Sequence, residues 1–165
     1  MANRTPADIG RRALLATAAL AAFAGAGLAG AKAGVPVEVW KDPSCGCCKD
    51  WIAHLEANGF QVKVHDSGNN AVRAQLGIDR KYGSCHTAVV AGHAIEGHVP
   101  AADIQRLLRD KPKALGLAVP GMIVGTPGMD TPAYQGRRES FDVLLLARGG
   151  GGASVFRHYE GNRKQ

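Results

Sequence analysis

The alternation of apolar and polar residues predicts two short strands near the start of the globular part of the chain. Residues 35–40 place Val35, Val37 and Val39 on one side, and residues 60–65 repeat the alternation. Between them, apolar residues recur at helical spacing over residues 48–58. The Asn58-Gly59 pair is typical of a helix C-terminus. We therefore expect strand, helix and strand in succession.

The next segment predicts a second helix, a hairpin and a third helix. Residues 70–76 favour a short helix, and an apolar strand is expected over residues 87–91. A turn at Gly92-His93 leads into a strand over residues 94–98, and a helix is expected over residues 100–109. The order strand-helix-strand-helix-strand-strand-helix predicts an α/β fold with a thioredoxin-like core.

The C-terminal part predicts an extension of this core. Residues 112–132 are rich in Pro and Gly, which favours a loop. Alternating segments at 141–147 and 153–159 flank the glycine run 149–152, so we expect a β-hairpin. The predicted domains are a core over residues 34–111 and an extension over residues 112–160 packed on it.

The first 33 residues have the pattern of an export signal. Arg11-Arg12 precedes an apolar run rich in Ala and Gly, and Ala31-Lys32-Ala33 follows as an A-x-A cleavage signature. Paired arginines indicate the twin-arginine route to the periplasm. The alternative, a retained anchor, is disfavoured because the run is shorter and less apolar than a typical span of about 20 residues. We expect a cleaved leader and no stable membrane span.

The charge of the chain does not indicate a nucleic-acid partner. The formal net charge is +6, but the predicted leader carries four basic side chains against the single acidic residue Asp8. The remaining basic residues are scattered, and no basic stripe is interleaved with aromatic side chains. We therefore expect no nucleic-acid binding.

Four cysteines form the candidate site: Cys45, Cys47, Cys48 and Cys85. Three of them lie within four residues, which suits a site better than structural disulfides between distant segments. Cys45 and Cys48 have the C-x-x-C spacing at the start of a predicted helix, where unpaired N–H groups favour thiolates. In a thioredoxin-like topology the segment containing Cys85 packs beside this motif. Four thiolates suit Zn(II), Cu(I) or an iron–sulfur cluster.

Further soft or imidazole donors lie near these cysteines in the sequence. Adjacent Cys47 and Cys48 suit bridging between several ions better than binding a single tetrahedral one. Met122 and Met129 each occur in a Pro-Gly-Met turn and favour Cu(I), either as ligands or as a lid over the site. His86 is the best additional ligand or proton carrier, with a supporting role as the alternative. His98, at the entrance to a predicted helix, is interpreted as structural.

Four motifs in order identify a family resemblance. The chain resembles the CopG-like copper-resistance family of periplasmic metal-binding proteins, formerly a domain of unknown function, through residues 41–48, residues 82–87, residues 96–100 and the two Pro-Gly-Met turns. The resemblance spans residues 35–159. It implies a thioredoxin-like core, more than one Cu(I) ion held by the four cysteines, and a role in copper resistance that includes interconversion of Cu(I) and Cu(II).

Three functions are compatible with these motifs. The preferred one is a periplasmic Cu(I)-binding protein whose partners are copper ions and other periplasmic copper-resistance proteins. The second is a metal-free thiol–disulfide oxidoreductase in which Cys45 and Cys48 are the catalytic pair. The third is a structural zinc module. As an enzyme, the protein would be a copper or thiol–disulfide oxidoreductase.

Overall fold

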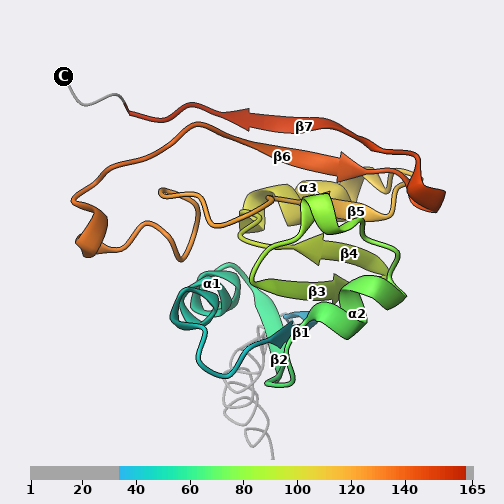
Figure 1. Cartoon of the computed structure of the whole chain (residues 1–165), viewed down its shortest axis with the longest axis horizontal. Coiled ribbons are helices and arrows are strands. Elements are labelled where there is room, and N and C mark those ends of the chain that lie inside the picture. The colour runs from blue at the N-terminus through green and yellow to red at the C-terminus, as the bar shows by residue number, and fades with distance from the viewer. Residues whose placement is uncertain (1–33, 163–165) are drawn as a thin grey trace, which may run out of the picture. The chain divides into compact units, whose positions relative to one another are not determined.

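A single mixed β-sheet organises the part of the chain that the structure describes. The structure is a computed structural model and describes residues 34–162, so the predicted leader lies outside the described residues. The sheet has seven strands in the order β2-β1-β3-β4-β5-β6-β7 (Figure 1). The strands are β1 Val35–Lys41, β2 Phe60–His65, β3 His86–Val90, β4 His93–Glu96, β5 Gly116–Ala118, β6 Phe141–Leu146 and β7 Ala153–Tyr159.

Three α-helices connect these strands in the predicted order. They are α1 Gly46–Ala57, α2 Asn70–Gln75 and α3 Ala101–Asp110. The pairing of β1 is parallel with β2 and antiparallel with β3, and β3 pairs antiparallel with β4. The structure confirms a mixed α/β fold with the predicted order of elements. The thioredoxin likeness itself and the boundary at residue 111 stay predictions. Within residues 34–162, none of the helices has the length and apolar character needed to cross a membrane.

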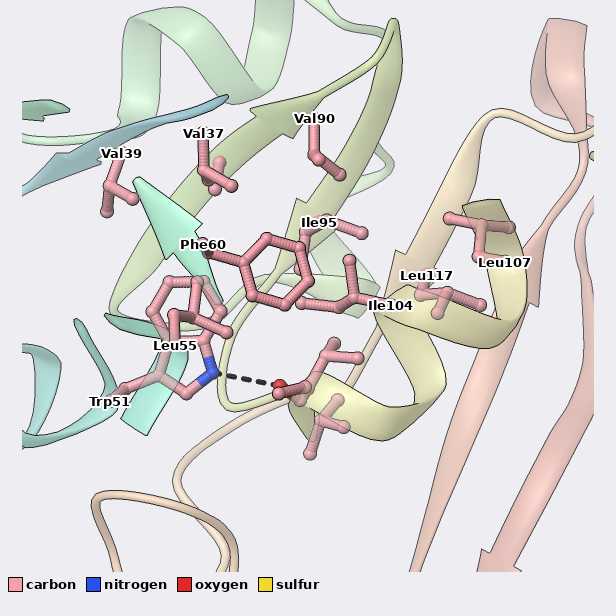
Figure 2. Close-up of a cluster of buried hydrophobic side chains, with 14 of the residues drawn as sticks. Val37, Val39, Trp51, Leu55, Phe60, Val90, Ile95, Ile104, Leu107 and Leu117 are labelled. Carbon is pink, nitrogen blue, oxygen red and sulfur yellow. Dashed lines mark hydrogen bonds between the residues drawn. The ribbon is translucent and has the colours of Figure 1, made fainter. Parts of the chain in front are cut away.

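The main core lies between the sheet and the pair α1 and α3. Trp51 and Leu55 of α1 and Ile104 of α3 are fully buried against inward side chains of the central strands (Figure 2). The indole N–H of Trp51 donates to the carbonyl of Val99 at 2.9 Å, so the polar edge of this large apolar ring is satisfied inside the core. Trp51 therefore fixes the start of α1 relative to the residues that lead into α3.

The extension continues the sheet through a strand that the sequence pattern did not predict. β5 pairs in parallel with β4 and antiparallel with β6, so the β6–β7 hairpin joins the same sheet. The expectation of a loop throughout residues 112–132 is therefore wrong at residues 116–118. A Cβ atom on Gly116 would lie 1.7 Å from the carbonyl oxygen of Ala94. Glycine is needed for this close pairing, and the same residue weakens a strand signal in the sequence.

The predicted hairpin is confirmed and is also attached to α3. β6 and β7 pair antiparallel, and the glycine run lies at their turn. The hydroxyl of Tyr159 donates to Asp103 of α3 at 2.6 Å, and the guanidinium of Arg106 lies over the ring of Phe156. These contacts fix the hairpin on the helix that begins next to the cysteine site.

Candidate metal centre

A tight turn places the cysteine motif at the start of α1. The carboxylate of Asp42 accepts the backbone N–H of Ser44 at 2.8 Å, and the Asp42 carbonyl accepts the N–H of Cys45 at 3.0 Å. This turn ends β1, and α1 begins at Gly46 with Cys45 as the residue that precedes it. Local sequence therefore accounts for the placement of the three clustered cysteines at a helix N-terminus.

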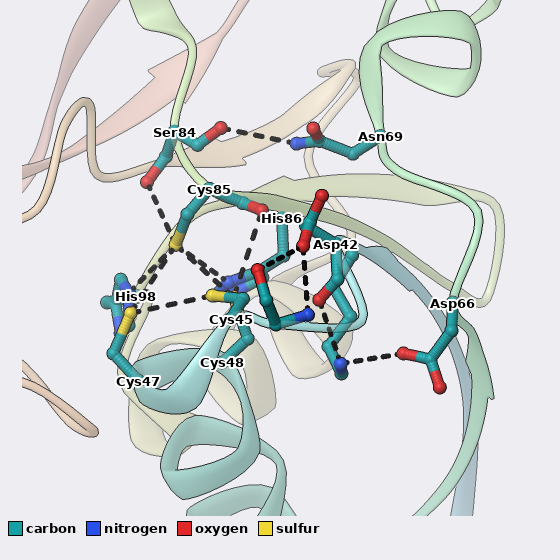
Figure 3. Close-up of a disulfide and its surroundings, with 12 residues drawn as sticks. Asp42, Cys45, Cys47, Cys48, Asp66, Asn69, Ser84, Cys85, His86 and His98 are labelled. Atoms are coloured by element: carbon teal, nitrogen blue, oxygen red, sulfur yellow. Dashed lines mark hydrogen bonds and ion pairs between the residues drawn. A yellow bond between two sulfur atoms is a disulfide. The ribbon is translucent and has the colours of Figure 1, made fainter.

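The four predicted cysteines come together at this helix end (Figure 3). Cys45 and Cys48 form a disulfide, and the Sγ of Cys47 lies 3.6 Å from that of Cys45. The Sγ of Cys85, from the segment before β3, lies 3.5 Å from Cys48 and 4.0 Å from Cys47. All four sulfurs lie within 4.8 Å of one another, so the group has the spacing to hold a metal ion once the Cys45–Cys48 disulfide is reduced. The C-x-x-C pairing is confirmed, and so is the packing of Cys85 beside it.

The environment of Cys85 favours its protonated form in the protein alone. Burial, and then the neighbouring Cys47, raise the pKa of Cys85 to about 12. The thiol therefore keeps its proton at neutral pH. A cation bound among the sulfurs favours the thiolate, so metal binding here is coupled to release of a proton.

Two buried imidazoles extend the cluster, and only His86 was expected as a donor from the sequence. His86 is fully buried, and its Nδ1 lies 3.4 Å from the Sγ of Cys85. Its ring packs on Trp51 with a centroid separation of 4.2 Å. His98 is also fully buried, and its Nε2 lies closer, 3.1 Å from the same sulfur. Cys85, His86 and His98 form a second group with metal-ligand spacing.

The backbone determines which nitrogen of His98 carries the proton. Its Nδ1 lies 2.8 Å from the carbonyl oxygen of Pro127, and a carbonyl only accepts. Nδ1 therefore donates, which leaves an unprotonated Nε2 facing the Sγ of Cys85. Burial lowers the pKa of His98, which keeps the ring neutral. A backbone-oriented neutral imidazole with a free nitrogen is the usual form of a histidine metal ligand.

The hairpin register explains the position of His98, because the turn lies at Ala91-Gly92 and not at the expected Gly92-His93. β3 and β4 are joined by the two-residue turn Ala91-Gly92, both with positive φ, and Thr87 pairs with Glu96. Extension of that register by two positions places Cys85 opposite His98. The interpretation of His98 as only a helix-entrance residue missed this consequence of the turn.

The two methionines occupy different environments. Met122 is 60% exposed, whereas Met129 is buried and its sulfur accepts the hydroxyl of Tyr134 at 3.8 Å. Gly128, between Pro127 and Met129, lies so close to α1 that a Cβ atom there would be 2.6 Å from the carbonyl oxygen of Cys47. The second Pro-Gly-Met turn therefore packs directly on the cysteine motif.

The fold and the site define a small mixed α/β protein with a cysteine cluster at a helix N-terminus and two buried histidines beside it. Two solved structures of the copper resistance protein CopG are similar to it. Form 1 is 48% identical, with 78% of this chain and 99% of that chain covered and a TM-score of 0.70. Form 2 is 47% identical, with 76% and 98% covered and a TM-score of 0.69. The chain belongs to the CopG family.

Two further comparisons concern sequence alone. A family model described as a protein of unknown function, DUF411, matches residues 82–129. This segment contains Cys85, His98 and both Pro-Gly-Met turns, but not the cysteines of α1. No protein with a curated description matches the chain.

Proposed function

We propose that this protein binds Cu(I) through Cys45, Cys47, Cys48 and Cys85 and takes part in copper resistance. The observation that supports this most directly is the convergence of four sulfurs within 4.8 Å in a relative of proteins named for copper resistance. Thiolates are soft donors that select Cu(I). In this proposal the protein acts in the periplasm after export by the twin-arginine route.

The ligand set of the proposal includes one histidine. The Nε2 of His98 is directed at the Sγ of Cys85, so an ion bound to that thiolate has an imidazole nitrogen within reach. His86 packs behind Cys85 and is a weaker candidate because it is farther from the sulfur. Met122 and Met129 are proposed as additional thioether donors from the extension.

The arrangement of sulfurs favours more than one ion. Cys47 and Cys48 are adjacent in α1, and Cys85 lies within 4.0 Å of both. Each thiolate has several lone pairs, so neighbouring sulfurs in such a group can bridge ions. We therefore propose a bridged Cu(I) cluster rather than a single four-coordinate ion.

A redox role is the second candidate, and the disulfide favours it. Cys45 and Cys48 are joined, with the thiols of Cys47 and Cys85 beside them. When this pair is reduced, its two thiols can reduce two Cu(II) to two Cu(I), releasing two protons and forming the disulfide. This step couples copper state to thiol state. The metal-free alternative is disulfide exchange with another protein through the same pair.

Anaerobic titration with Cu(I) tests the main proposal. The reduced protein should bind more than one Cu(I) per chain, with sulfur-to-copper charge-transfer absorption in the ultraviolet and copper confirmed by elemental analysis. A sharp end point at one copper would contradict the cluster. Failure to bind copper, or a preference for zinc in elemental analysis after competition, would contradict the function. A variant with exposed His158 changed to Gln is a control that should bind copper normally.

A further inference from the structure

A buried carboxylate lies on the opposite face of the sheet from the main core. Glu96, at the end of β4, is 0% exposed. Its Oε1 accepts the backbone N–H of Ser84 at 2.7 Å and the Nε–H of Arg73 at 2.8 Å. Its Oε2 accepts the hydroxyl of Thr87 at 2.6 Å. Three donors on its two oxygens therefore hold this carboxylate in one orientation.

The hydrogen bonds around Glu96 also involve both backbone polar groups of Ser84. Arg73, from α2, bonds Glu96 through Nε and donates through Nη2 to the carbonyl of Ser84. Asn69 donates to that carbonyl as well, at 3.2 Å (Figure 3). The N–H and the C=O of Ser84 are therefore both bound to side chains from the body of the fold. The peptide that follows Ser84 is the one that leads into Cys85.

Cys85 lies just outside the sheet, so strand pairing does not hold its position. β3 begins at His86, and the pairing of β1 with β3 ends there, at Lys41 and His86. The side chain of Ser84 also donates to the carbonyl of Gly121, and the N–H of Gly121 donates to Gly83. The segment before Cys85 is thus held by α2, by β4 and by the loop that carries Met122.

We infer that Glu96 and Arg73 are positioning residues that hold the Ser84–Cys85 segment so that the Cys85 sulfur stays beside Cys47 and Cys48. A buried ion pair contributes little net stability compared with apolar side chains of similar volume. It does impose direction, because each of its hydrogen bonds requires a fixed geometry. The role in copper binding rests on the proposed function; the positioning of the thiol does not.

The first test measures the Cys85 thiol without any metal. In the oxidised protein Cys45 and Cys48 are protected by their disulfide, so an alkylating reagent such as iodoacetamide reacts with Cys47 and Cys85 only. Peptide mass spectrometry at low conversion yields the ratio of the two rates. In Glu96→Gln that ratio should shift toward Cys85 by about tenfold, because a charged hydrogen bond no longer restrains the segment. Global unfolding exposes both thiols and moves the ratio toward one, so the shift in Glu96→Gln is judged against a variant that is destabilised elsewhere in the fold.

A matched control separates positioning from general destabilisation. Asp103 of α3 is another fully buried carboxylate, but it accepts the hydroxyl of Tyr159 and forms an ion pair with Arg157, both of β7. Asp103→Asn should therefore lower stability while changing the alkylation ratio far less than Glu96→Gln does, under conditions in which both variants remain folded. If Glu96→Gln folds and its ratio matches the wild type, or if both variants change it equally, the inference is overturned.

A milder variant and a copper measurement complete the test. Arg73→Lys keeps a positive charge beside Glu96 but lacks the planar fork that bonds Glu96 through Nε and the Ser84 carbonyl through Nη2, so it should raise the ratio several-fold even if Glu96→Gln fails to fold. An unchanged ratio in this variant overturns the inference. In competition with a Cu(I) chelator, both Glu96→Gln and Arg73→Lys should retain copper less well than Asp103→Asn. A wild-type protein that binds no copper, together with changed alkylation ratios, would refute the proposed function and leave the positioning role standing.

Discussion

Replacement of Gly128 by alanine tests whether the second Pro-Gly-Met turn packs directly against the backbone of α1. Gly128 has φ +85°, and a Cβ atom would lie 2.6 Å from the Cys47 carbonyl oxygen and 2.8 Å from the Trp51 amide nitrogen. Both neighbours are backbone atoms of α1, so no side chain can rotate away. Gly121, in the first turn, has φ +75° with nothing within 4 Å of the same position. Gly121→Ala is therefore a matched control for backbone strain alone.

The two alanines differ in expected cost for structural reasons. Both must adopt left-handed backbone geometry, which costs roughly 1–2 kcal/mol. Gly128→Ala adds overpacking against the helix, about 1–3 kcal/mol. It also displaces the Pro127 carbonyl from the Nδ1 of His98, which costs about 1 kcal/mol. We expect a total of about 3–6 kcal/mol for Gly128→Ala against about 1–2 kcal/mol for Gly121→Ala.

Urea denaturation measures this difference. Both variants and the wild type are compared with the Cys45–Cys48 disulfide intact, since the unfolding free energy is comparable only at equal disulfide state. Copper retention after reduction provides a second measurement, which should fall in Gly128→Ala because His98 loses its orienting partner. Equal unfolding free energies for the two variants would show that the turn does not approach α1 this closely. They would also contradict the orientation of His98 by the Pro127 carbonyl.

Four further predictions concern the site. Cys85→Ser should reduce Cu(I) loading as severely as Cys47→Ser, whereas a metal-free oxidoreductase would lose insulin reduction with Cys45→Ser and hardly respond to Cys85→Ser; normal loading of the Cys85 variant contradicts the four-sulfur site. The oxidised protein should bind Cu(I) far more weakly than the reduced one in chelator competition across defined thiol–disulfide potentials, and flat retention would exclude the cysteines as redox-sensitive ligands. His98→Gln should weaken Cu(I) binding by about tenfold and remove a nitrogen ligand from the copper X-ray absorption spectrum; an unchanged spectrum excludes that ligand. Burial, and then His98, lower the pKa of His86 from 6.5 to about 3, so only the unfolded chain takes up this proton between those values. As the pH is lowered below 6.5, His86 by itself should reduce the unfolding free energy by about 1.4 kcal/mol per pH unit. Urea denaturation without metal should therefore give a shallower slope in His86→Gln than in the wild type; equal slopes would contradict this assignment.

Features that depend on near neighbours in the chain were predictable from the sequence. The alternation at residues 60–65 and 153–159 predicted β2 and β7 with their observed bounds. The C-x-x-C spacing predicted the Cys45–Cys48 pair because residues three apart at a helix start lie side by side. These signals are readable because each is set by backbone geometry over a few residues.

The tertiary structure alone decided which distant groups meet. Residues 96–98 read locally as the end of a strand and a helix entrance, yet the hairpin register brings His98 to Cys85 and directs Glu96 toward Arg73 on the other face. β5 was missed because its pairing requires a glycine, which lowers the local strand signal. In each case the deciding contact joins segments far apart in the chain, and its geometry follows from strand order and register rather than from local propensity.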